Sequence, residues 1–161
     1  DFERTQYSDG CFKSSLRAPV AYYIARLTRG IVLGTGNKSE DGFLGYYSKS
    51  GDNLVDVQLI ADLYKWEVYI VAQMLGTIES ILQAQPTADL GLESNTDEDE
   101  LGFSYDFVEL YMKLMSKEET VQNKLLANLS PDAKLSYDKM TERILAINKM
   151  NKHKFVMPQH I

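Results

Sequence analysis

Residues 34–56 are the stretch that most constrains how this chain folds and what it binds. They hold five glycines, two lysines and four carboxylates in 23 positions, directly after the apolar run 31–33. An apolar, β-branched run followed by Gly-Thr-Gly predicts a buried parallel strand that ends in a turn, where open α/β sheets place their ligand crevice. Glycines let a ligand approach the backbone, lysines bind anionic groups, and carboxylates hold a hard cation or a ribose hydroxyl. The stretch therefore indicates a nucleotide-type site or, alternatively, a simple turn between a strand and a helix.

Two general phosphate-binding motifs do not match this stretch. A Walker loop requires Gly-Lys-Ser/Thr in direct succession, but Asn37 separates Gly36 from Lys38. A dinucleotide fingerprint requires a third glycine at the position of Ser39. The residues by themselves leave the nucleotide site and the simple turn equally open.

Composition and charge exclude several classes of protein. A length of 161 residues with 44% hydrophobic content suffices for one globular domain with a core. The net charge of −6, with no cluster of Lys and Arg, argues against a nucleic-acid surface. The lone Cys11 excludes an internal disulfide, and with two histidines beside it a zinc site is not expected. No apolar stretch approaches the roughly 20 residues of a membrane span, and the first 20 residues hold no signal-peptide core. We therefore expect a soluble, cytoplasmic protein without a nucleic-acid or membrane partner.

Apolar spacing predicts a chain that is mostly helical outside a short strand at 31–33. The expected helices are 12–29, 63–75, 78–83, 105–115 and one that opens at Ser130-Pro131-Asp132. The first should have Pro19 in its first turn and end at Gly30, and the second should be stopped by Gly76. The apolar stripe of the 63–75 helix is interpreted as core or subunit interface. The acidic run 97–100 is interpreted, for most of its length, as a solvated face or helix start.

Several blocks of this sequence resemble the NAD synthetase family, the ammonia-using branch of the ATP-pyrophosphatase superfamily. The blocks are 34–40 (Gly-Thr-Gly-Asn-Lys-Ser-Glu), 45–52, Val55-Asp56, 62–65, 86–90, 96–105, and His153-Lys154 followed by Pro158. They keep the order of the family from about residue 13 to residue 158. Agreement of so many ordered blocks identifies the chain as similar to this family.

The resemblance implies an α/β fold, of which this chain would be the C-terminal portion. The whole fold is a doubly wound parallel sheet that binds an adenine nucleotide, and this portion should be mostly helical. The pyrophosphate loop of the superfamily, Ser-Gly-Gly-x-Asp-Ser, occurs nowhere in the 161 residues. We therefore expect residues 1–161 to be the C-terminal part of a single synthetase domain whose phosphate-loop half lies outside this chain. On this basis the chain alone should be inactive.

The activity that the resemblance implies is the ATP-dependent amidation of deamido-NAD. ATP would adenylate the nicotinate carboxylate and release pyrophosphate, and ammonia would then displace AMP to give NAD, with Mg²⁺ bound. The resemblance also implies a homodimer, for which the aromatic helix 12–29 is a candidate contact. Two alternatives stay open: another ATP-pyrophosphatase that amidates a different carboxylate, and a non-catalytic nucleotide-binding or dimerising module.

The resemblance implies four residues on the ATP side of the site. Thr35, Lys65 and Thr87 would contact ATP, and Glu40 would bind magnesium. Without the resemblance, Glu40 would be a solvated acid at a helix start and Thr87 a turn or cap residue.

Four other residues would contact deamido-NAD by the same resemblance: Lys49, Asp56, His153 and Lys154. Taken alone, Lys49 would be a loop cation and Asp56 a cap. The pair His153-Lys154 would be explained as cations near the C-terminus of a helix.

The sequence departs from the family pattern in two places. Where the family often has Ala-Arg-x-Arg, this chain has Ser14-Ser15-Leu16-Arg17, which leaves Arg17 as a candidate anion contact or a surface cation. One extra residue stands between Glu40 and Gly45, which predicts a local difference in the backbone. The resemblance also places the acidic run 97–100 near the active site, in a mobile lid.

Overall fold

The computed structural model describes residues 4–87 and 96–156. Helices dominate this part of the chain, and two short strands form a parallel pair. The elements are α1 (Gln6–Thr28), β1 (Leu33–Gly34), the π-helix η1 (Lys38–Leu44), β2 (Val57–Gln58), α2 (Lys65–Met74), α3 (Glu79–Leu82), α4 (Asp97–Leu101), α5 (Tyr105–Met115), α6 (Glu119–Ala127), α7 (Pro131–Asn151) and the 3-10 helix η2 (Lys152–Lys154).

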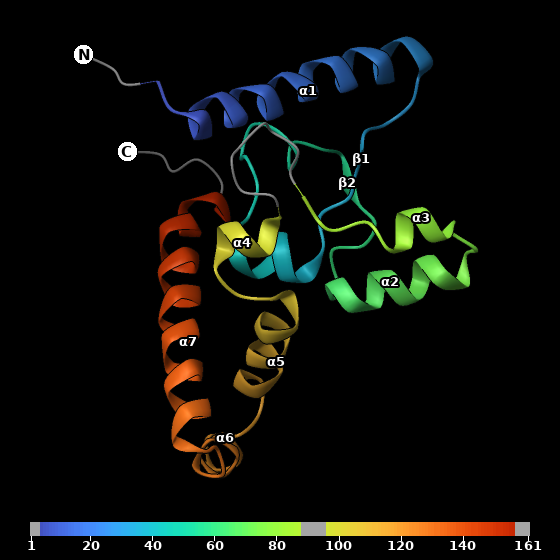
Figure 1. Ribbon diagram of the computed structural model, residues 1–161. Coiled ribbons are helices and arrows are strands. Elements are labelled where there is room, and N and C mark those ends of the chain that lie inside the picture. The colour runs from blue at the N-terminus through green and yellow to red at the C-terminus, as the bar shows by residue number, and fades with distance from the viewer. Residues whose placement is uncertain (1–3, 88–95, 157–161) are drawn as a thin grey trace.

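The elements form a helical half and a sheet half, joined by η1. In Figure 1, α5 and α7 run beside each other with α6 at the turn between them. The strands lie on the other side of η1, flanked by α2 and α3, and α1 lies across one end of the molecule. This mixture of helices with a parallel strand pair is the α/β class predicted from the sequence.

The parallel pair places the glycine-rich stretch at the carboxyl end of β1. Leu33 pairs with Val57, and Gly34 pairs with Gln58. The strand begins two residues later than predicted, but it ends at Gly34, next to the predicted Gly-Thr-Gly turn. Leu33 is 52% exposed, so this chain leaves part of its own sheet uncovered.

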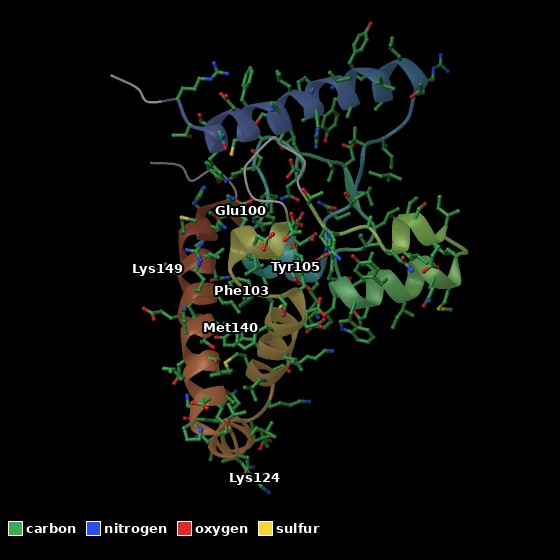
Figure 2. All side chains as sticks on the ribbon, in the orientation of Figure 1. Glu100, Phe103, Tyr105, Lys124, Met140 and Lys149 are labelled. Atoms are coloured by element: carbon green, nitrogen blue, oxygen red, sulfur yellow. The ribbon has the colours of Figure 1, made fainter. Side chains whose placement is uncertain are left out.

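The hydrophobic core lies between η1, α4, α5 and α7. Its buried members are Leu44, Leu101, Phe103, Tyr105, Val108, Tyr111, Ile144 and Ile147. Figure 2 shows Phe103 and Met140 between α5 and α7, whereas Lys124 projects from α6. The core therefore fixes η1 against the two long C-terminal helices.

Helix α7 starts as predicted and anchors the end of η1. Ser130 accepts a hydrogen bond of 3.3 Å from Ala133 N, which caps the helix before Pro131. Near the other end of α7, Asn148 Nδ2 donates to Phe43 O at 2.6 Å and Asn151 Nδ2 donates to Leu44 O at 2.9 Å. These amides satisfy carbonyls that a helix end leaves without intrahelical partners.

The segment with the extra residue forms the π-helix η1. Asn37 opens it by accepting hydrogen bonds of 3.0 Å from Ser39 N and Glu40 N. Gly42 N then donates to Asn37 O at 3.2 Å, five residues back, and Gly45 closes the helix with a φ of +63°. Because π-helical turns hold more residues than α-helical turns, this geometry accommodates one additional residue.

Helix α1 begins earlier than the sequence pattern predicts. Thr5 and Ser8 form a capping box, with both hydrogen bonds 3.1 Å long, so the helix starts at Gln6 rather than near residue 12. Pro19 consequently lies inside the helix and not in its first turn, which corrects the prediction. The helix ends at Arg29, in the left-handed region with a φ of 57°, one residue before the predicted Gly30.

The interpretation of the 63–75 stripe as core is wrong within this chain. Helix α2 covers residues 65–74 and Gly76, with a φ of +75°, stops it as predicted. However, its apolar residues Trp66, Ile70 and Met74 are exposed, and Met74 is 81% exposed. The other part of that interpretation, a subunit interface, stays a prediction.

In the described part of the chain, no helix is both long and apolar enough to cross a membrane.

Candidate functional site

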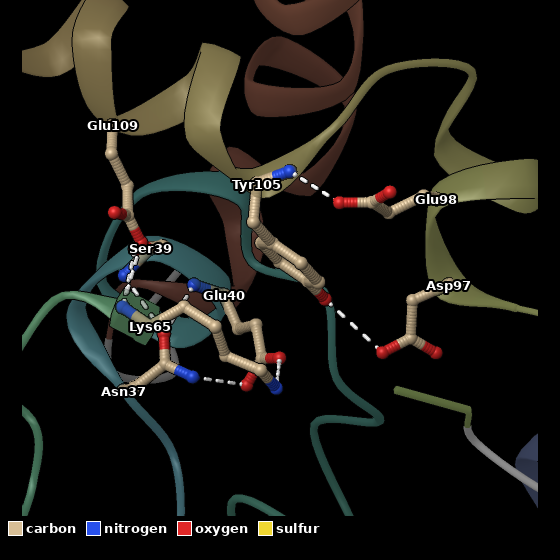
Figure 3. A network of polar contacts seen from close by, with 8 residues as sticks. All are labelled: Asn37, Ser39, Glu40, Lys65, Asp97, Glu98, Tyr105 and Glu109. Carbon is tan, nitrogen blue, oxygen red and sulfur yellow. Dashed lines mark hydrogen bonds and ion pairs between the residues drawn. The ribbon is translucent and has the colours of Figure 1, made fainter. Parts of the chain in front are cut away.

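An ion pair between Glu40 and Lys65 forms the centre of the site. Glu40 lies in the first turn of η1, after the carboxyl end of β1, and Lys65 is the first residue of α2. The Nζ of Lys65 meets Oε1 of Glu40, and the two side chains are only 20% and 15% exposed. Lys65 Nζ also lies 5.0 Å from the centre of the Tyr105 ring. Figure 3 shows this pair between η1, α2 and α5.

Asn37 holds the carboxylate of Glu40 in place. Its Nδ2 donates to Glu40 Oε2 at 2.5 Å, while its Oδ1 caps η1. Asn37 is itself buried. Both oxygens of Glu40 therefore have partners, one cationic and one neutral, and the carboxylate has a defined orientation.

Tyr105 links this centre to α4. Its hydroxyl donates to Asp97 Oδ2 at 3.2 Å, and its backbone N donates to Glu98 Oε1 at 2.9 Å. The acidic run forms a helix start, as predicted, because Asp97 is the first residue of α4. Asp97 is nevertheless buried and not solvated, whereas Glu98 and Asp99 are exposed. Burial raises the pKa of the Asp97 carboxyl and the pKa of the Tyr105 hydroxyl. The polar network of Figure 3 thus extends from η1 to α4.

Glu40 could serve as one of several ligands of a magnesium ion. In the described residues, no group of three or more His, Cys, Asp or Glu side chains is arranged to hold a metal ion. Mg²⁺ is nevertheless commonly held by one or two carboxylates together with phosphate oxygens and water. A single oriented carboxylate beside a lysine fits that ion only where a bound phosphate supplies further ligands.

Asp41 is the carboxyl in this site with the most perturbed pKa. Burial and, to a smaller extent, the charges of Glu40 and Asp52 raise that pKa from its ordinary value of 3.8 to about 7, against the opposing effect of Lys154 and Lys65. The folded state therefore binds more protons than the unfolded state between about pH 4 and pH 7. Folding stability falls as the pH rises through this window and stays lowered above it.

We expect Asp41→Asn to stabilise the fold at pH 8 and to have a smaller effect at pH 5. The amide removes a charge that burial disfavours, and at pH 5 that charge is already absent from the folded protein. Thermal unfolding in metal-free buffer at the two pH values measures the difference. Asp62→Asn, at an exposed position, is the matched control. An equal shift in Tm for Asp41→Asn at both pH values would contradict the assignment.

Two of the predicted dinucleotide residues join the end of the chain to the segment after η1. Lys49 Nζ donates to His153 O at 2.9 Å and to Val156 O at 3.0 Å. Lys154 Nζ donates to Gly45 O at 2.9 Å and to Tyr47 O at 2.6 Å. Burial lowers the pKa of the Lys154 ammonium. The structure thus brings Lys49, His153 and Lys154 to one region.

Asp56 lies apart from that region, next to the strands. Its Oδ2 accepts a hydrogen bond of 2.8 Å from Val32 N, and its Oδ1 accepts one of 3.4 Å from the Tyr22 hydroxyl of α1. These contacts hold Asp56 against the segment before β1 and against α1, and Asp56 is not the N-cap of any helix in the described chain, unlike the cap considered from sequence alone. Within the described residues, no hydrogen bond or ion pair joins Asp56 to the two lysines or to His153.

The two threonines predicted on the ATP side are both exposed. Thr35 directly follows β1, close in sequence to η1. Thr87 follows Pro86, whose carbonyl accepts a hydrogen bond of 3.0 Å from Asp97 N and so lies at the start of α4. Arg17 is exposed on α1. The two threonines thus lie in loops that follow β1 and precede α4.

A cavity of about 200 Å³ opens beside the predicted dinucleotide residues. It lies between α1, the segment after η1, α4 and the end of α7, and Lys154, Tyr47 and Asp52 are among its lining residues. Typical small-molecule sites have roughly 300 to 1,000 Å³. The cavity is therefore large enough for one ring of a ligand rather than for a whole dinucleotide.

Sequence reasoning missed four residues of the polar network: Asn37, Ser39, Tyr105 and Glu109. The first three lie inside the blocks that resemble the family, and their place in those blocks is the signal that could have identified them. Glu109 falls on the stripe 105, 108, 109 and 112 of α5, where an acid among apolar residues indicates a buried polar partner.

Comparisons with known proteins show the family to which this chain belongs. The family model described as NAD synthase matches residues 1–158, and the chain therefore belongs to the NAD synthase family. The chain is 36% identical over 149 residues to an NH3-dependent NAD(+) synthetase of Thermoplasma volcanium, covering 92% of this chain and 55% of that protein. It is 48% identical over 101 residues to the protein of that name in Methanococcoides burtonii, covering 63% of this chain and 38% of that protein.

Two solved structures share the fold. An NMN synthetase from Francisella tularensis matches with a TM-score of 0.78 and 25% identity, covering 99% of this chain and 58% of that one. An NH3-dependent NAD synthetase from Campylobacter jejuni, in complex with a nitrate ion, matches with a TM-score of 0.67 and 27% identity, covering 100% of this chain and 58% of that one. The chain thus spans little more than half the length of each solved relative.

Proposed function

We propose that this chain forms the C-terminal half of an enzyme that makes NAD from deamido-NAD, ATP and ammonia. An oxygen of the nicotinate carboxylate attacks the α-phosphorus of ATP, and pyrophosphate leaves. Ammonia then attacks the carbonyl carbon of the acyl-adenylate and loses a proton, and AMP leaves with the former carboxylate oxygen. The observation that carries this proposal is the shielded Glu40–Lys65 pair after β1, in a chain of the NAD synthase family.

The ATP side of the proposed site is the network around Lys65. The ammonium of Lys65 has a flexible stem and three donors, which suit phosphate charge that moves during reaction. Glu40, oriented by Asn37, would hold the magnesium ion that neutralises the phosphates. Thr35 and Thr87 would complete the ATP contacts from the two flanking loops.

The dinucleotide side lies around the cavity near the end of α7. Lys49 and Lys154 bring two ammonium groups to this region, and the cavity that Lys154 lines together with α1 has room for one ring of the substrate. His153 is exposed next to Lys154 in the sequence. Asp56 would reach the substrate only from the strand side, so it is the least supported member of the set.

The remaining half of the proposed enzyme would cover the sheet and α2. The apolar side chains of Leu33, Ile70 and Met74 are exposed in this chain, and burial of such surface contributes roughly 25 cal/mol per Å². We place the half with the Ser-Gly-Gly-x-Asp-Ser loop against this face. Its backbone N–H groups would bind the phosphates.

We propose a homodimer that forms through α1. This helix buries small residues such as Ala18 toward the rest of the chain and exposes Leu16, Val20, Tyr23 and Leu27 on its other side. A contiguous apolar surface of this kind is typical of an interface. Light scattering of the complete enzyme should give twice the protomer mass, and the mass of one protomer at all concentrations would contradict the proposal.

A second candidate product is nicotinamide mononucleotide. It is favoured by the fold similarity to a protein described as an NMN synthetase. The small size of the cavity does not separate a mononucleotide from one end of a dinucleotide. The relatives described as NAD(+) synthetases are more similar in sequence, which favours the dinucleotide.

Product analysis tests the proposed function. The complete enzyme is incubated with ATP, Mg²⁺, ¹⁵N-ammonium and either deamido-NAD or nicotinate mononucleotide. We expect NAD that carries one ¹⁵N atom, together with equal amounts of AMP and pyrophosphate. Preference for the mononucleotide would support the second candidate, and nucleotide binding without any product would support a non-catalytic module.

A further inference from the structure

Glu109 is a buried carboxylate that the proposed reaction does not use. It lies on α5 among residues of the hydrophobic core and is only 3% exposed. Its Oε1 accepts a hydrogen bond of 2.7 Å from Ser39 Oγ and another of 2.7 Å from the backbone N of Lys65. Ser39 Oγ also lies 3.3 Å from the same backbone N. Figure 3 shows these three groups meeting where η1, α2 and α5 come together.

The position of Glu109 has a physical cost that its partners offset. A carboxylate is expensive to bury and persists in a fold only where donors meet it. One donor here is a hydroxyl that is itself fully buried. The other is the first N–H of α2, a group that has no partner inside its helix and lies at the positive end of the helix dipole. Space filling alone does not require an acid at this position.

We propose that Glu109 is a positioning residue that fixes Lys65 against Glu40. A single oxygen holds both the backbone start of α2 and the side chain of Ser39, the residue before Glu40. The backbones that carry the lysine and the carboxylate are thereby fixed relative to each other. The inference rests on the proposed function, because it assigns Glu109 to the ATP side of that site.

Kinetics of the complete enzyme test this role with two substitutions. Glu109→Leu removes the acceptor at similar volume, whereas Glu109→Gln keeps an oxygen that can accept both hydrogen bonds. We expect Glu109→Leu to raise the KM for ATP at least about tenfold and leave the KM for deamido-NAD within about twofold, since one charged hydrogen bond is worth about this ratio. Glu109→Gln should restore most of the ATP affinity. Glu142→Leu, the same substitution at an exposed position on α7, is the control.

Amide hydrogen exchange tests the same role without a substrate. In Glu109→Leu the amide of Lys65 should exchange about tenfold faster, because it loses its shorter hydrogen bond and keeps only the 3.3 Å contact with Ser39 Oγ, while the amides of α7 keep their protection. This measurement separates the two proposals. An enzyme that makes no NAD but shows the local change at Lys65 would retain Glu109 as a positioning residue and reject only the proposed reaction.

Two results would overturn the inference. The first is an unchanged KM for ATP and unchanged Lys65 exchange in a folded Glu109→Leu enzyme. The second is a loss in Glu109→Gln as large as in Glu109→Leu, with protection lost equally in α7, which would assign Glu109 to general stability. If Glu109→Leu does not fold, Ser39→Ala carries the test, and it should raise the KM for ATP by about threefold without global loss of protection.

Discussion

Replacement of Lys65 by alanine should lower NAD formation by the complete enzyme about 30- to 1,000-fold. The lysine lies in a shielded position beside Glu40, where its charge would face the phosphates of ATP. Loss of one preorganised electrostatic donor from such a site costs on the order of 2 to 4 kcal/mol in transition-state stabilisation. The free energy of unfolding should also fall, because Glu40 loses its cationic partner and keeps only the hydrogen bond from Asn37.

The effect of Lys65→Ala is measured as kcat/KM for ATP at saturating deamido-NAD and ammonium. Lys117→Ala, which removes an exposed lysine after α5, is the matched control and should leave the rate unchanged. Thermal unfolding of both variants shows whether the fold is intact. Wild-type rates of NAD formation in Lys65→Ala would contradict the assignment of this lysine to the ATP side of the site.

A polypeptide of residues 1–161 alone should release no pyrophosphate from ATP, at any ammonium concentration. The Ser-Gly-Gly-x-Asp-Ser loop is absent from this sequence. The backbone donors and the aspartate that such a loop provides for the triphosphate would therefore be missing. Lys65 and Glu40 would remain, but two side chains cannot hold a triphosphate in the orientation that in-line attack requires.

A pyrophosphate assay on the purified 161-residue polypeptide measures this outcome. Mass spectrometry should first establish an intact sequence and the absence of a second polypeptide. The complete enzyme, assayed in parallel, is the positive control. Sustained turnover by the short polypeptide would show that the phosphate loop is dispensable and would contradict the division of the domain into two halves.

Local signals in the sequence predicted several element ends. The strand that ends at the Gly-Thr-Gly turn, the helix start at Ser130 and the stop at Gly76 follow from local backbone chemistry, which is readable along one chain. The ion pair between Glu40 and Lys65 was not predicted. The two residues were assigned separately, to magnesium and to ATP, because both fall in blocks that resemble the family, and those roles stay predictions.

Two of the differences from the sequence predictions concern burial, and one concerns where a helix starts. The apolar stripe of α2 is exposed because no element within residues 4–87 and 96–156 covers it, and periodicity reports an apolar face without reporting its partner. Asp97 is buried because Tyr105 supplies a hydrogen-bond partner from the next helix. Pro19 lies inside α1 because the capping box at Thr5 outweighs the usual preference of proline for a first turn.

The conformation of the π-helix η1 was not predicted, although the position of its extra residue was. Comparison with the family pattern located one extra residue between Glu40 and Gly45, but not the form that it would take. The structure widens the turn and places the half-buried Asp41 beside Gly36, where an added Cβ would lie 1.8 Å from Asp41 Oδ2. A larger residue at position 36 would therefore require the Asp41 side chain to move.

Transfer of an oxygen label tests the proposed reaction most directly. Deamido-NAD carrying ¹⁸O in both oxygens of its nicotinate carboxylate is converted by the complete enzyme with ATP, Mg²⁺ and ammonium, and the products are analysed by mass spectrometry. Because the carboxylate attacks the α-phosphorus and ammonia then displaces AMP, one ¹⁸O should appear in AMP and one should stay in the amide of NAD. Unlabelled AMP, or label in inorganic phosphate, would contradict an acyl-adenylate and with it the function proposed for this chain.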